Sequence, residues 1–73
     1  MSEKEILSLG FKKNEWTYET ENFVEYIKGN GSIGIEISGI NLVEITAGKG
    51  VFITVPNCKT INDLKSLIKL LGL

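Results

Sequence analysis

Residues 51–71 read VFITVPNCKTINDLKSLIKLL, and this stretch decides the fold class. In residues 51–55, aliphatic side chains alternate with Phe and Thr, which is the period-two pattern of a β-strand. After Pro56 the spacing of the apolar residues changes from that of a strand to that of a helix. Thr60 is a favoured helix N-cap, and Asp63 supplies the negative charge that the first turn of a helix prefers. This part of the chain therefore predicts a strand followed by a helix.

The predicted C-terminal helix has one apolar side. Its apolar residues fall within an arc of about 120°, the width expected of a helix that lies on a sheet; they are Ile61, Leu64, Leu67, Ile68 and Leu71. Leu70 lies outside this arc, and Leu73 follows the Gly72 cap. We expect Leu70 and Leu73 to contact an N-terminal helix; the alternative is a small apolar patch used for self-association.

The period-two pattern also predicts strands before residue 51. The alternating positions are Trp16 and Tyr18, then Val24 and Tyr26 or Phe23 and Ile27, then Ile33, Ile35 and Ile37, then Val43 and Ile45. Residues 29–32, 38–41 and 47–50 contain the glycines that tight hairpins require. Short connections imply antiparallel neighbours, so we predict a meander.

Ser2 and Glu5 have the spacing of a capping box, which predicts a short helix over residues 3–9 that ends at Gly10. Residues 1–73 are then one small α+β domain. It has a short N-terminal helix, an antiparallel meander of about five strands, and a C-terminal amphipathic helix packed on one sheet face. A chain of 73 residues with 42% hydrophobic residues has material for one core.

The composition favours a cytoplasmic protein. The single Cys58 cannot form an intramolecular disulfide, and the first residues lack the cationic and apolar regions of a secretory signal. The apolar runs are also far shorter than the roughly 20 residues that cross a bilayer. We therefore expect no membrane partner.

The residue types argue against an enzyme. The chain has no His and no Arg, so the base that activates a catalytic Cys is missing. Cys58 is accordingly expected to be an inert, partly buried thiol. The segment 48–50, Gly-Lys-Gly, lacks the remainder of a phosphate-binding loop and is interpreted as a hairpin turn. The acidic residues lack the spacing of calcium loops, so we predict no catalytic residue, metal or cofactor.

The charge distribution indicates a protein-binding module. The net charge is −1, but residues 14–48 contain six Glu and one Lys, whereas the C-terminal helix is basic. An acidic sheet face attracts basic protein surfaces, including nucleic-acid grooves on another protein. The candidate partner-binding residues are Glu15 and Glu19, predicted to share a strand face, Glu36 and Glu44 on later strands, and Leu70 and Leu73. The alternative interpretation is a solvated outer face.

Three further surfaces are candidates for interaction with a partner. Lys59, Lys65 and Lys69 could contact a nucleic-acid backbone, although without Arg specific base recognition is not expected. Self-association through the terminal leucines would make the chain a homo-oligomer subunit. Exposed aromatic residues are the third: Trp16, Tyr18 and Phe52 are candidates to share one sheet face, and the alternative is packing between strands.

Three segments taken together resemble small uncharacterised phage and prophage proteins of low-GC bacteria. They are Leu9-Gly10-Phe11-Lys12-Lys13, the Tyr18-Glu19 strand, and the Thr60-Ile61-Asn62-Asp63-Leu64 helix start. Some small phage proteins of this size block host defence nucleases. The resemblance implies an accessory protein or an inhibitor of a host protein, and it carries no catalytic residues.

Overall fold

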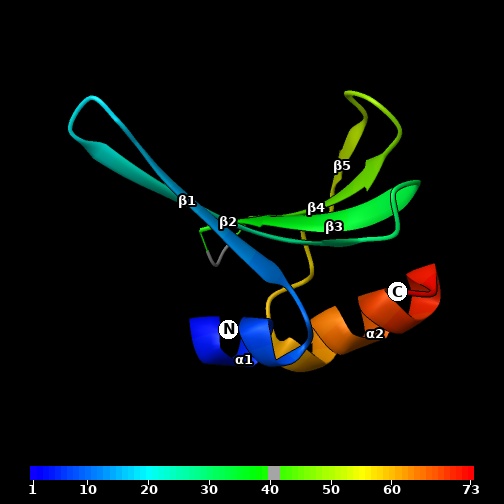
Figure 1. Ribbon diagram of the computed structural model, residues 1–73. Helices are drawn as coiled ribbons and strands as arrows, with labels where there is room; N and C mark the ends of the chain where they lie inside the picture. The colour runs from blue at the N-terminus through cyan, green and yellow to red at the C-terminus, as the bar shows by residue number, and fades with distance from the viewer. Residues whose placement is uncertain (40–41) are drawn as a thin grey trace.

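The computed structural model describes residues 1–39 and 42–73. The elements are α1 (Glu3–Ser8), β1 (Lys12–Tyr18), β2 (Glu21–Gly29), β3 (Ile33–Ser38), β4 (Leu42–Ala47), β5 (Phe52–Thr54) and α2 (Ile61–Leu71). The strands form one antiparallel sheet in chain order, as Figure 1 shows. The predicted α+β meander is confirmed. One predicted turn, at residues 38–41, includes residues 40 and 41, which lie outside the described residues.

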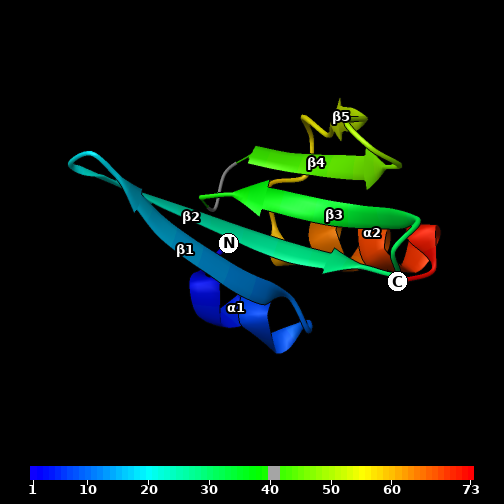
Figure 2. The same cartoon turned by 45° about the horizontal axis from the view of Figure 1, so that its top comes forward.

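Both helices lie on the same side of the sheet, which leaves the other side without a helix (Figures 1 and 2). We call these sides the covered face and the uncovered face. The core lies between the covered face and the helices, and its buried members are Ile6, Phe11, Tyr26, Ile35, Ile37, Val43, Cys58 and Leu64. A chain of this length builds one such layer pair around one core.

The register decides which side chains of β2 enter the core. Tyr26 pairs with Ile37, and Ile37 pairs with Val43, so these three share the covered face. Because successive residues of a strand point to opposite faces, Phe23 and Ile27 lie on the uncovered face, each 36% exposed. Of the two patterns predicted for this strand, the one with Tyr26 inside is therefore confirmed.

Both helices begin with the predicted capping chemistry. Ser2 Oγ accepts a hydrogen bond from the Glu5 N–H at 3.2 Å, and Glu5 Oε1 accepts one from the Ser2 N–H at 2.9 Å. Thr60 and Asp63 make the same reciprocal pair at the start of α2. These bonds satisfy amides that have no partner within the helix. Hydrogen bonds also lower the pKa of both carboxyls, because they favour the charged forms: those with Ser2 act on Glu5, and that from the Lys59 N–H, followed by those with Thr60, acts on Asp63.

A polar contact ties α1 to the sheet. The hydroxyl of Tyr26 donates to Glu3 Oε1 at 3.1 Å, and Lys13 Nζ lies 2.6 Å from the same oxygen. The Lys13 ammonium, followed by the Tyr26 hydroxyl, lowers the pKa of Glu3. Tyr26 thus places its ring in the core while its hydroxyl reaches the rim, as buried tyrosines commonly do.

The structure corrects the expectation for Leu70. Leu64 of α2 is fully buried, whereas Leu70 is 82% exposed and does not pack on α1. Leu70 follows Leu64 by six residues, about 240° around the helix, so it leaves the side that faces the sheet. Leu73, by contrast, is partly buried and packs against the core. The two leucines therefore do not form one exposed patch.

Candidate functional site

Three glutamates converge on the uncovered face. Glu36 of β3 is paired directly with Glu44 of β4, and Ile27 of β2 lies on the other side of Glu36. Glu25 is the next residue of β2 on the same face, so it lies diagonally across from Glu36. Glu25 also accepts a hydrogen bond from Asn14 Nδ2 at 3.2 Å. Glu25, Glu36 and Glu44 are the acidic cluster.

The acidic cluster concentrates negative charge. The pKa of Glu36 is raised, first by the hydrogen bond with Glu25, then by partial burial, and then by the negative charges of Glu25 and Glu44. A hydrogen bond between two carboxyls requires a proton, so this contact favours the protonated form. Within residues 1–39 and 42–73, the ion pairs shorter than 4.0 Å involve Lys13, Glu3 and Glu15, and none involves the cluster. Lys12 lies on the same face, because it pairs with Ile27, which in turn pairs with Glu36.

Exposed apolar side chains lie on the same face as the acidic cluster. The register places Trp16, Tyr18, Phe23, Ile27, Leu42 and Phe52 there, all at least one third exposed. Trp16 stacks on Phe23 with ring centroids 5.6 Å apart and an interplanar angle of 16°. Trp16, Tyr18 and Phe52 therefore share a sheet face as expected, and Trp16 also makes the cross-strand contact that was the alternative.

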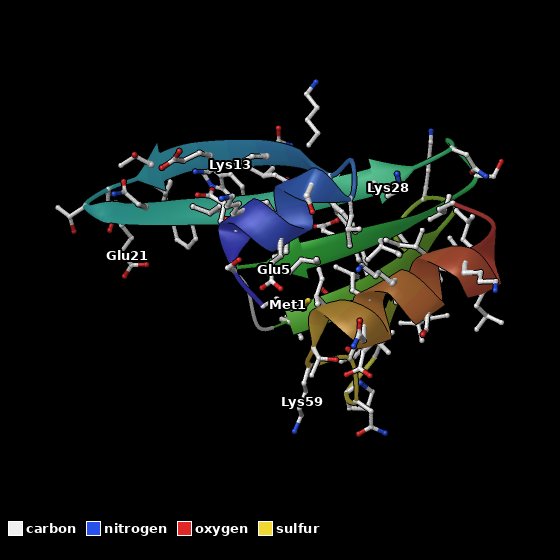
Figure 3. All side chains as sticks on the ribbon, turned by 90° about the horizontal axis from the view of Figure 1, so that it is seen from below. Met1, Glu5, Lys13, Glu21, Lys28 and Lys59 are labelled. Carbon is white, nitrogen blue, oxygen red and sulfur yellow. The ribbon has the colours of Figure 1, made fainter. Side chains whose placement is uncertain are left out.

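The hairpin of β1 and β2 extends beyond the remainder of the sheet. The pairing of β2 with β3 starts at Glu25, and the Gly39 N–H donates to the Val24 carbonyl at 2.9 Å. Among residues 1–39 and 42–73, residues 16–23 pair only with each other. We call residues 14–25 the arm; they comprise this projecting part and the two residue pairs that join it to the sheet, Asn14–Glu25 and Glu15–Val24. In Figure 1 it projects away from the helices, and Figure 3 shows Glu21 near its far end. The arm contains four Glu and no Lys.

Two predicted site residues lie elsewhere. Glu19 occupies the tight turn at the tip of the arm with φ 56°, so the expectation that it shares a strand face with Glu15 is wrong. Such turns favour Gly or Asn at positive φ, and the sequence here offered neither. Glu15 pairs with Val24, which packs against the core, and its carboxylate lies 3.6 Å from Lys13 Nζ. Neither residue joins Glu36 and Glu44.

Glu25 is the cluster residue that sequence reasoning missed. It stands two residues before Ile27 on β2, so the pattern already placed both on one face. Only the register between β2 and β3, which pairs Glu25 with Ser38, brings its carboxyl next to Glu36. The alternation within β2 predicts that Glu25 and Ile27 share a face, but the sequence does not tell which residue of β3 pairs with Glu25.

A second surface lies beside α2. A groove of about 260 Å³ is lined by Val55, Asn57, Cys58, Asp63, Ser66, Leu67 and Leu70. The Cys58 thiol is buried, and this burial, followed by the negative charge of Asp63, raises its pKa. A raised pKa means less thiolate at neutral pH, which agrees with an inert thiol. Leu70 is the exposed apolar member of this groove.

No family model, curated protein or solved structure matches the chain. Among the residues that the structure describes, none of the helices is long and apolar enough to span a membrane. In the same residues, no three His, Cys, Asp or Glu side chains are grouped so that they could hold a metal ion.

Proposed function

We propose that the chain is a non-enzymatic protein-binding module whose uncovered sheet face receives a positively charged segment of another protein. The observation that carries the proposal is the acidic cluster: Glu25, Glu36 and Glu44 share one face with exposed apolar side chains, and none of the ion pairs among the described residues involves them. Charge and exposed apolar area on one face are the two components of a specific interface.

The cluster is unfavourable in the isolated domain. Like charges directly opposite on adjacent strands cost roughly 0.2–1 kcal/mol. A Lys or Arg side chain placed between Glu36 and Glu44 would replace this repulsion with charge-assisted hydrogen bonds. Neighbouring Ile27 and Leu42 would then exclude water from the contact, which strengthens it. The same face repels phosphates, so nucleic acids and anionic lipids are poor ligands for it.

The resemblance to small phage proteins guides the choice of partner. It suggests an accessory protein or inhibitor of a host protein, so the first source to test is a lysate of the organism that encodes the chain, with and without infecting phage. Binding, rather than catalysis, is the activity to measure.

The test compares the wild-type domain with a Glu36→Lys/Glu44→Lys variant as bait. The expected result is a partner that the wild-type domain retains and the variant loses. An Asn62→Lys variant serves as control, because it adds positive charge on exposed α2, away from the uncovered face. Equal capture by all three domains, or capture by none, would contradict the proposal. Thermal unfolding of each bait confirms that it is folded.

A second function, self-association, is favoured by Leu70. This side chain is 82% exposed beside an apolar groove, and burying it in a homodimer would remove it from water. The measurement is the mass in solution at rising concentration. A dimer would have twice the 8.1 kDa of the chain, and Leu70→Lys would return it to the monomer. A monomeric wild-type protein excludes this function.

A further inference from the structure

The arm alternates carboxylates with aromatic rings along one face. Glu21, Phe23 and Glu25 are successive uncovered-face residues of β2, so their Cα atoms are spaced about 6.8 Å apart. On β1, Tyr18 pairs with Glu21 and Trp16 pairs with Phe23. The arm therefore presents flat rings between anionic groups at regular intervals.

The rings of the arm are more exposed than folding requires. Tyr18 is 68% exposed and Trp16 is 46% exposed, although Trp16 stacks on Phe23. The stack stabilises a two-stranded ribbon that would otherwise be marginal in water. Tyr18, however, lies outside the stack and faces Glu21. Exposed Trp and Tyr side chains are the residues that most often anchor protein interfaces.

We infer that the arm occupies a groove that binds single-stranded nucleic acid on the partner protein. This inference rests on the proposed function and names the class of its partner. Such grooves combine a cationic track with aromatic platforms on which bases stack. Glu21 and Glu25 take the place of phosphates on that track, and Trp16 and Tyr18 take the place of bases on the platforms.

Other kinds of partner fit the arm less well. A second copy would bring two arms with four Glu each into contact, and a nucleic acid or an anionic membrane would meet the same repulsion. A purely basic surface would pair with the carboxylates but leave the rings in water. A groove with both cationic and aromatic groups satisfies the whole arm.

The experiment is a displacement assay. Proteins from the lysate that bind single-stranded DNA are loaded with fluorescein-labelled oligodeoxythymidine, and the domain is then added while anisotropy is followed. The wild-type domain is expected to release the oligonucleotide. Trp16→Ala/Tyr18→Ala is expected to be about 30-fold less potent, because it removes an anchor of the contact. Asn62→Lys is expected to act like the wild type.

The double variant could lose potency because the arm unfolds. The single variant Tyr18→Ala controls for this, because it leaves the Trp16–Phe23 stack in place, and it too is expected to lose potency. Failure of the wild-type domain to release the oligonucleotide would overturn the inference, as would binding of the oligonucleotide to the domain alone. If the Glu36/Glu44 bait experiment still yields a partner in that case, the proposed function holds and only this partner class is wrong.

Discussion

Glu36 lies directly opposite Glu44 on the uncovered face, and Glu25 of β2 lies diagonally across from it. Glu36→Gln keeps the shape of the side chain and removes one charge from this cluster. We expect the variant to be more stable than the wild type at pH 7 by about 0.2–1 kcal/mol, the cost of an opposed like-charge pair. Urea unfolding of both proteins measures the difference.

The pH dependence of this difference has a defined sign. The folded-state pKa of Glu36 is raised above its ordinary value of 4.5, so the folded protein holds this proton more tightly than the unfolded chain does. The contribution of Glu36 to stability is fully present below pH 4.5 and is lost as pH rises through the folded-state pKa. The advantage of Glu36→Gln should therefore vanish in acid. A difference that is independent of pH would contradict the raised pKa, and Glu21→Gln at the tip of the arm is the control.

Trp16 is the only Trp of the chain, so its fluorescence reports directly on the arm. Because Trp16 is stacked on Phe23 yet half exposed, we expect Phe23→Ala to increase quenching by acrylamide and to lower stability by about 0.5–1.5 kcal/mol. Phe52→Ala on β5 is the control and should leave quenching unchanged. Equal quenching in the wild type and Phe23→Ala would mean that the stack does not persist in solution.

The sequence predicted the elements of this fold because their signals are local. The alternation of Ile33, Ile35 and Ile37, the capping box at Ser2 and the N-cap at Thr60 are each signalled within a few residues, and all are present. The acidic cluster depends instead on pairing between strands. Glu36 and Glu44 were identified as candidates, but no local pattern states that Glu25 reaches the carboxyl of Glu36.

The two predictions that were wrong, for Glu19 and for Leu70, also have physical reasons. Glu19 adopts a positive φ that its residue type disfavours, so nothing in its own chemistry marks a turn. Leu70 was expected to contact the N-terminal helix although it lies outside the apolar arc of its own helix, but one exposed leucine is common on folded proteins. Its position around α2, rather than its type, decides that it faces water.

Leu64 and Leu70 provide a matched pair on one helix. Leu64 is fully buried against the sheet, so Leu64→Ala is expected to cost about 2–5 kcal/mol of unfolding free energy. Leu70→Ala removes the same atoms from an exposed position and is expected to change stability by less than about 0.5 kcal/mol. Denaturant unfolding measures both. A large loss for Leu70→Ala would indicate that Leu70 is buried in a homo-oligomer.

Cys58 is expected to react slowly with a thiol reagent such as DTNB in the folded protein. Its thiol is buried and its pKa is raised, so both access and the thiolate fraction are low. Labelling then requires opening of the contact between α2 and the sheet, and its rate follows the population of the open form. Leu64→Ala should accelerate labelling strongly, whereas Leu70→Ala should not. Labelling of the wild type as fast as in denaturant would show that Cys58 is accessible without any opening, and the groove beside α2 would then be wider than the structure describes.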